Sequence, residues 1–124
     1  MSREPIFSTV EVHPKGWGDE LWISNNDKYC GKILRFSKGA SFSMHYHVEK
    51  EETWCVTKGL LKLEYFNLET AERLEKELKE GDTVHLLPCV PHKLTAIEES
   101  AVFEVSTQHF EDDSYRVERG SSQK

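Results

Sequence analysis

One stretch of 21 residues, GASFSMHYHVEKEETWCVTKG at positions 39–59, constrains this chain more than any other. His45 and His47 stand two residues apart, so on a β-strand their side chains point to the same side. Glu52 follows five residues after His47, at the start of a second β-rich run. Two imidazoles and a carboxylate on adjoining strands form a nitrogen and oxygen donor set that suits a divalent first-row metal ion.

A fourth candidate donor lies in a second segment, LLPCVPHKL, where His92 follows a turn that contains two prolines. The histidine pair alone would fit the surface of an ordinary strand better than a metal site. The carboxylate, the flanking glycines and the second segment together favour a metal site. We therefore expect one divalent metal ion on His45, His47, Glu52 and His92, and the donor set is compatible with Zn, Mn, Fe or Ni.

These two segments resemble the motifs of the cupin superfamily. The first fits G-x5-H-x-H-x4-E-x6-G at every position, through Gly39, His45, His47, Glu52 and Gly59. Glu51 is an alternative ligand, but it would leave seven residues before the closing glycine, so Glu52 is preferred. The second segment resembles G-x5-P-x-G-x2-H through Gly81 and His92, with Leu87 in place of the proline and Cys89 in place of the glycine.

The resemblance implies an all-β fold, the cupin-type jelly-roll β-barrel or double-stranded β-helix, built of antiparallel strands. The sequence agrees, because many short β-rich runs alternate with Gly/Pro turns. Residues 69–81, ETAERLEKELKEG, are rich in helix formers. Their only large apolar side chains are Leu74 and Leu78, so we expect a strand paired with residues 60–66 instead.

Length and composition predict one domain. The 124 residues fit a single cupin domain, with an N-terminal arm at 1–16 that contains a strand near 7–12, and a flexible tail at 117–124. A net charge of −6 argues against nucleic acid or an anionic membrane as partner. No apolar run approaches the roughly 18 residues of a membrane span. Three cysteines without pairing-like spacing and the absence of a signal-peptide pattern predict a cytoplasmic protein.

Strand periodicity also suggests an oligomer. Ser41, Ser43, His45 and His47 would share one face, while Phe42, Met44 and Tyr46 would share the other. An apolar outer face needs cover, which a second subunit or the N-terminal arm could supply. We expect a homodimer.

A narrower resemblance is to the cupin domain of type II phosphomannose isomerases, which often form the tail of mannose-1-phosphate guanylyltransferases. The Trp17-Gly18 pair after Lys15 is similar to the entrance of that domain, although Gly16 replaces its usual proline. Such domains commonly end with a strand that carries a Glu-Val pair, followed by an acidic pair and then an arginine. This sequence has the same order in Glu104-Val105, Asp112-Asp113 and Arg116. The resemblance implies an isomerase of a sugar phosphate of the mannose-6-phosphate type.

Such an aldose–ketose isomerase would work through a divalent metal and an enediol. Candidates for proton transfer or orientation are His85, Glu104 and Lys32, and none is assigned as catalytic. Arg35 and Arg116 are candidates for binding the phosphate, and we choose Arg116. His13 and His109 are expected in solvent. Two alternatives remain open: an iron-dependent cupin oxygenase or lyase acting on a small molecule, and a non-catalytic cupin that binds a sugar or effector.

Overall fold

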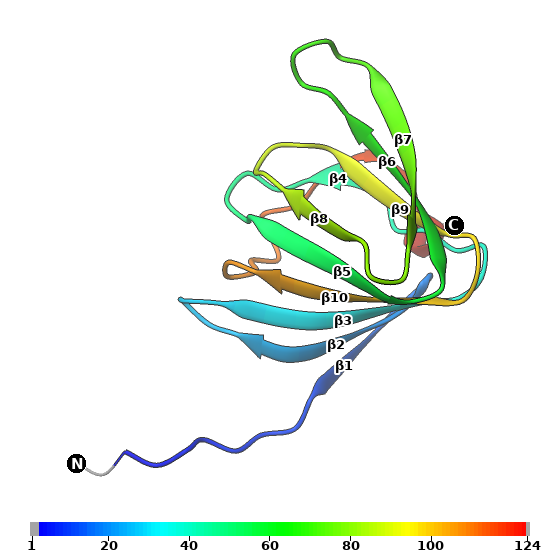
Figure 1. Ribbon diagram of the computed structural model, residues 1–124. Helices are drawn as coiled ribbons and strands as arrows, with labels where there is room; N and C mark the ends of the chain where they lie inside the picture. The colour runs from blue at the N-terminus through cyan, green and yellow to red at the C-terminus, as the bar shows by residue number, and fades with distance from the viewer. Residues whose placement is uncertain (1–2, 124) are drawn as a thin grey trace.

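The chain folds into two antiparallel β-sheets that face each other, as a computed structural model describes for residues 3–123 (Figure 1). The strands are β1 (Glu11–Lys15), β2 (Gly18–Asn25), β3 (Cys30–Phe36), β4 (Met44–Tyr46), β5 (Glu52–Lys58), β6 (Leu60–Phe66), β7 (Arg73–Lys79), β8 (Thr83–Leu86), β9 (His92–Ala96), β10 (Ser100–Ser106) and β11 (Tyr115–Glu118). One sheet has the order β1-β2-β3-β10-β5-β8 and the other β11-β4-β9-β6-β7. The predicted jelly roll is confirmed.

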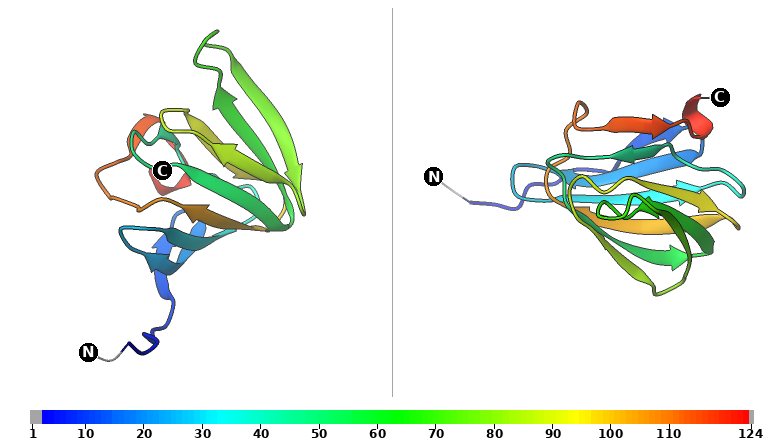
Figure 2. Two further views of the ribbon diagram at one scale, coloured as in Figure 1. Left: turned by 60° about the vertical axis from the view of Figure 1, so that its left-hand side comes forward. Right: turned by 90° about the horizontal axis from the view of Figure 1, so that it is seen from above.

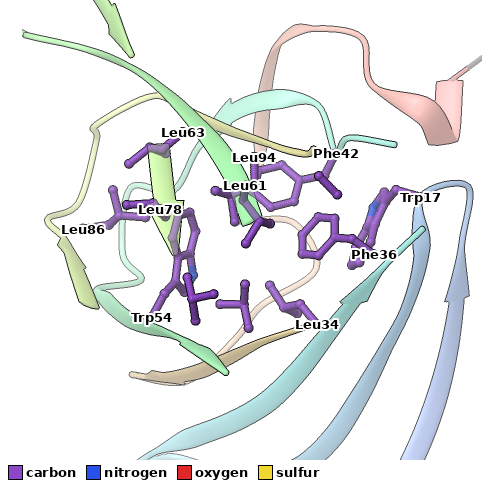
Figure 3. Packing of buried hydrophobic residues seen from close by; sticks show 13 residues of the cluster. Trp17, Leu34, Phe36, Phe42, Trp54, Leu61, Leu63, Leu78, Leu86 and Leu94 are labelled. Carbon is purple, nitrogen blue, oxygen red and sulfur yellow. The ribbon is translucent and has the colours of Figure 1, made fainter. Parts of the chain in front are cut away.

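Apolar side chains from both sheets fill one end of the barrel (Figure 3). The ring of Trp17 is buried there and stacks on Phe36 with 4.6 Å between ring centroids. Leu61, Leu94 and Val102 are fully enclosed. This packing leaves the opposite end of the barrel free for polar side chains.

Residues 73–79 form a strand despite their helix-forming composition, as predicted. In β7, Leu78 faces Leu61 of β6 and is buried, whereas the surrounding Glu and Lys side chains are mostly exposed. Pairing with β6 satisfies the backbone and buries Leu78, so the tertiary contacts override the local propensity. Within residues 3–123 the only helix is the 3₁₀ turn at Ser121–Gln123 (η1). No helix of these residues is long and apolar enough to span a membrane.

The turn that leads to His92 keeps the backbone shape expected of a glycine. Cys89 stands where cupins usually have glycine, and its φ is 74°, in the left-handed region. The Cys89 N–H donates to the carbonyl oxygen of His47 at 2.6 Å. This bond joins the two motif segments and holds the turn in place without the glycine.

Both ends of the chain differ from expectation. The N-terminal strand begins at Glu11 rather than near residue 7, because pairing with β2 covers only Glu11–Lys15. The tail, expected to be flexible from 117 onward, is packed instead: β11 pairs with β4, and Ser121 Oγ accepts a hydrogen bond from the Ser41 N–H at 2.9 Å. Residues 1–2 and 124, which belong to the predicted arm and tail, lie outside the described residues.

The strand that carries the histidines is covered by its own chain. The backbone is irregular at 42–43, so Phe42 turns into the barrel beside His45 instead of facing outward with Met44. Met44 is fully buried, and Tyr46 stacks on Tyr115 of β11. Met44 is therefore buried within this chain, and the stacking on Tyr115 covers part of Tyr46.

Candidate metal centre

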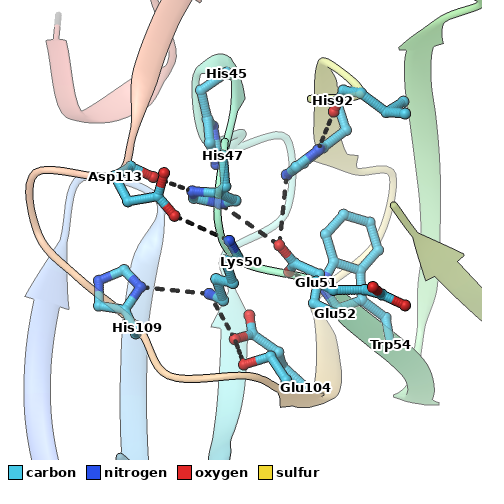
Figure 4. A network of polar contacts seen from close by, with 12 residues as sticks. His45, His47, Lys50, Glu51, Glu52, Trp54, His92, Glu104, His109 and Asp113 are labelled. Carbon is cyan, nitrogen blue, oxygen red and sulfur yellow. Dashed lines mark hydrogen bonds and ion pairs between the residues drawn. The ribbon is translucent and has the colours of Figure 1, made fainter. Parts of the chain in front are cut away.

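Three histidines converge inside the polar end of the barrel (Figure 4). His45 on β4 and His92 at the start of β9 are register partners on neighbouring strands, and His47 follows directly after β4. One nitrogen from each ring lies within 4.8 Å of the others. This spacing allows one ion to contact all three rings.

Backbone carbonyls fix the tautomer of each ring. Nδ1–H of His45 donates to the Ser43 carbonyl at 2.6 Å, and Nδ1–H of His47 donates to the Asp113 carbonyl at 2.6 Å. Nδ1–H of His92 donates to the Val90 carbonyl at 2.9 Å. With the proton on Nδ1, Nε2 of each ring presents a lone pair, which is the form that binds a metal.

Burial keeps the three rings neutral. It lowers the pKa of His45 to about 4, with His47 adding to the effect. It also lowers the pKa of His47, and that of His92 falls well below its usual value because of burial and the neighbouring His45. Near neutral pH each imidazole is therefore uncharged, and its Nε2 carries no proton that a metal ion would have to displace.

Glu52 lies beside the histidines, and Glu51 does not. Glu52 is buried, with Oε2 3.5 Å from His47 Nε2 and 4.0 Å from His92 Nε2, while Oε1 accepts the Trp54 indole N–H at 2.7 Å. Burial and the nearby Glu104 carboxylate raise the pKa of Glu52. Glu51 points out of the barrel and pairs with His85 at 2.6 Å. The three imidazoles and Glu52 fit the chemistry of a divalent Zn, Mn, Fe or Ni ion.

A second set of buried charges lies next to the histidines. Lys50 Nζ donates to Glu104 Oε2 at 2.7 Å, and both side chains are almost fully buried. Burial alone would lower the pKa of Lys50, but Glu52 and Glu104 outweigh it and raise that pKa. Lys32 is equally buried, 3.4 Å from Glu20 and with its ammonium 4.2 Å from the Trp22 ring centroid. Such groups are costly to bury, so each is paired.

Asp113 joins the C-terminal loop to the metal strand. Its carboxylate accepts hydrogen bonds from the N–H groups of Val48, Glu49 and Lys50, between 2.8 and 3.2 Å. Burial would raise the pKa of Asp113, but these three donors outweigh it and lower the pKa. Its backbone carbonyl orients His47. One residue thus positions both the ligand ring and the turn leading to Lys50.

The histidines and the buried charges border one cavity of about 760 Å³. Its charged lining residues are the cations Lys15, Lys32, Lys50 and Arg116 and the anions Glu20, Glu52, Glu104 and Glu111. The four cationic and four anionic side chains have formal charges that cancel, so a bound divalent ion would give the cavity a net positive charge. A cavity of this size and charge suits a small, anionic, oxygen-rich molecule.

The structure divides the other predicted site residues into two groups. Glu104, Lys32 and Arg116 line the cavity. His85 and Arg35 do not: both are exposed on the outside of the barrel, where Arg35 pairs with Asp19.

Two residues that line the cavity were not predicted as site residues from the sequence. His109 was expected in solvent, yet its ring lies in the cavity 3.4 Å from Lys50 Nζ, and burial together with Lys32 and Lys50 lowers its pKa to about 3. It belongs to an irregular loop that gives no periodic signal. Lys50 could have been found, because it stands two residues before Glu52 and so shares its side of the chain.

No protein-family model and no curated protein sequence matches the chain significantly. Solved structures do. The capsular polysaccharide assembling protein CapF from Staphylococcus aureus matches with a TM-score of 0.76 and 14% identity over 88% of this chain and 34% of that chain. Oxalate decarboxylase from Bacillus subtilis matches with a TM-score of 0.76 and 16% identity over 93% of this chain and 33% of that chain. The chain thus spans about a third of each, and the similarity establishes a cupin-type fold. Together with the three converging histidines, it supports a metal site in a barrel of the cupin type.

Proposed function

We propose that this chain is a metal-dependent enzyme for a small anionic substrate, and that within this class it isomerises a sugar phosphate. The observation that carries the proposal is the set of three neutral imidazoles, each fixed by a backbone carbonyl so that Nε2 is free. Glu52 completes the proposed ligand set. A bound divalent ion would supply Lewis acidity toward a substrate carbonyl or hydroxyl oxygen.

The cavity also supplies a group for proton transfer. Glu104 is buried beside the ligands, and although burial raises its pKa, Lys50 and Lys32 outweigh this and keep the pKa below its usual value. We propose that its carboxylate takes the proton from C2, next to the carbonyl carbon C1, and returns it to C1 through an enediol, while the proton of the C2 hydroxyl passes to the C1 oxygen. Lys50, which donates to Glu104 at 2.7 Å, would hold that carboxylate in position.

Arg116 is the proposed phosphate-binding residue. It lies on β11 opposite His45 in register, lines the cavity and remains exposed. Lys15 lines the same cavity, so two cations at exposed positions are available to an anionic group of the substrate. The resemblance to type II phosphomannose isomerase domains makes mannose 6-phosphate the first substrate to examine.

A second candidate is an oxygenase or lyase that acts on a small carboxylic acid. The positive charge that the cavity would have with a bound divalent ion favours this function as much as the isomerase. Oxalate decarboxylase from B. subtilis, which is similar in fold, has Mn(II) centres. An oxygenase would need redox-active iron, whereas an isomerase would work with zinc or manganese. A third possibility is a cupin that binds its ligand without converting it.

Elemental analysis of the purified wild type beside His45→Ala/His47→Ala, followed by an assay of mannose 6-phosphate conversion, tests the proposal. We expect near-stoichiometric metal that is lost in the variant, and conversion to fructose 6-phosphate that requires the metal. Glu104→Gln should keep the metal and lose conversion. Metal without conversion would reject the isomerase, and iron with oxygen consumption would favour the oxygenase. A protein without metal after reconstitution would contradict the metal site itself.

A further inference from the structure

A second cavity, here called the side cavity, has a volume of about 450 Å³ and is bordered by β6, β7, β8 and the turn after β8. β7 and β8 are the last strands of their sheets. The β6–β7 hairpin extends beyond the rest of the barrel (Figure 2), and Tyr65 and Leu74 near its end are only partly buried. No residue lines both the side cavity and the metal cavity. The side cavity is therefore a separate candidate site.

The floor of the side cavity is apolar. It consists of Leu63, Leu78 and Leu86, one from each of the three strands, and all three are buried members of the core cluster. Tyr65 packs against the same cluster, and Leu87, which is 57% exposed, extends the apolar lining to the surface. Small-molecule sites commonly have an apolar lining and a volume of about 300–1,000 Å³. This floor suits the apolar part of a small ligand.

Lys76 is the exception in this lining. Alternation along β7 places it on the inner face between Leu74 and Leu78, where a strand of a half-buried sheet would normally carry a third apolar residue. It lies opposite Leu63 in register, and its side chain is exposed. Its ammonium forms no ion pair with any carboxylate of residues 3–123. A cation beside an apolar floor can therefore pair with a ligand.

The other charged residues that line the side cavity already have partners. Asp82 lies in the β7–β8 turn, where its Oδ2 accepts the N–H of Lys79 at 2.9 Å. His85 Nε2 lies 2.6 Å from Glu51 Oε2. Within residues 3–123, the ammonium of Lys76 is thus the charge in this lining that is available to a ligand. The complementary group is an anion, and a carboxylate accepts hydrogen bonds from an ammonium.

We propose that the side cavity binds a small molecule that has an apolar body and one carboxylate. The apolar body lies against Leu63, Leu78 and Leu86, and the carboxylate pairs with Lys76. Removal of apolar surface from water supplies most of the affinity, and the ion pair at the surface sets the orientation of the ligand. The proposal does not depend on the metal or on any activity.

Calorimetric titration of the full-length protein with three probes tests the chemistry of the ligand. Octanoate has both the carboxylate and the apolar chain, 1-octanol has the chain alone and acetate has the carboxylate alone. We expect octanoate to bind about 5-fold more tightly than 1-octanol, as the ion pair adds to the burial of the chain, and acetate not to bind at the same concentrations. Acetate binding as tight as that of octanoate would place the carboxylate elsewhere and overturn the proposal. Absence of octanoate binding would also overturn it and leave Lys76 as a charge that protects an edge strand from pairing.

Two lysine variants test the role of the cation. Lys76→Met removes the ammonium and keeps an unbranched apolar side chain, so octanoate binding should weaken about 5-fold while 1-octanol binding changes less than about 2-fold. Lys79→Met is the matched control, because Lys79 is an exposed lysine on the outer face of the same strand, and it should change neither. Equal weakening of octanoate and 1-octanol by Lys76→Met, or equal effects of the two variants on octanoate, would overturn the pairing with Lys76.

Nuclear magnetic resonance locates the bound probe without any substitution. On titration of the wild type with octanoate, the backbone amide signals of Leu63, Leu78 and Leu86 should shift, whereas those of His47 and Lys50 in the metal cavity should not. Shifts confined to the metal cavity would overturn the proposal and leave the metal site as the binding site of the carboxylate.

Discussion

Two neighbouring pairs of positions on the six-stranded sheet reverse the usual placement of charged and apolar side chains. On β3 and β10, the register partners Lys32 and Glu104 face into the barrel and are buried, whereas the adjacent partners Ile33 and Phe103 face outward and are partly exposed. An ordinary sheet of this kind would bury the apolar pair and expose the charged one. The buried charges therefore carry an energetic cost, which pairing with opposite charges offsets.

Breaking one buried ion pair of the inner face should have the largest effect. Lys50→Met leaves the carboxylates of Glu104 and Glu52 close together without their main cation. We expect the metal-free protein to lose about 3–5 kcal/mol of unfolding free energy, measured by denaturant titration. Lys50→Met/Glu104→Leu should recover part of this loss, because Glu52 is then the only one of the two carboxylates left without its cation. A small effect of Lys50→Met alone would show that water reaches the pair.

The pH dependence of stability should come from the inner face as well. The folded-state pKa of His45 is lowered from 6.5 to about 4, so between these values the unfolded chain binds more protons. The contribution of His45 to the stability of the metal-free protein should be complete above pH 6.5 and fall by roughly 3 kcal/mol toward pH 4. His45→Leu should remove this contribution, which is measured as the difference between the denaturant-unfolding profiles of variant and wild type.

The sequence predicted those parts of the fold that depend on short-range spacing. The interval between His45 and His47, and the glycines that bound their segment, specify a strand–turn–strand unit and the position of Glu52. The convergence with His92 was expected from the resemblance of both segments to the cupin motifs. The strand at 73–79 could be predicted because Leu74 and Leu78 offer too little apolar surface for a helix. There the helix-forming composition disagrees with the structure, and the pairing with β6 decides it.

Other features depend on contacts between distant segments, and spacing does not record them. Phe42 enters the barrel because the strand is irregular at 42–43, which breaks the alternation. The C-terminal tail packs because β11 pairs with β4, and the ring of His109 is carried into the cavity by an irregular loop. Cys89 adopts a positive φ that its residue type would not predict. All four are decided by tertiary structure.

Two neighbouring residues of β10 allow the inner and outer faces to be compared directly. Val102 is fully buried in the core, and Phe103 faces outward and is partly exposed. Val102→Ala should cost about 2 kcal/mol of unfolding free energy, because it opens a cavity in the core. Phe103→Ala should cost less, although its side chain is larger, because water can reach the space that the ring leaves. A larger loss in Phe103→Ala than in Val102→Ala, measured by denaturant titration, would contradict this comparison of the two faces.

The smallest effect is expected from the ion pair on the outer face. Arg35 contacts Asp19 through two hydrogen bonds of 2.7 and 2.6 Å, as short as the bond between Lys50 and Glu104. The bond from Arg35 lowers the pKa of Asp19, yet the arginine is exposed, so water and salt screen the pair. Arg35→Gln should leave the denaturant midpoint of the protein unchanged at physiological salt. The two pairs have similar distances, so a clear loss of stability in Arg35→Gln would mean that distance rather than burial decides their strength. Burial would then no longer explain why Lys50 and Glu104 are costly to separate.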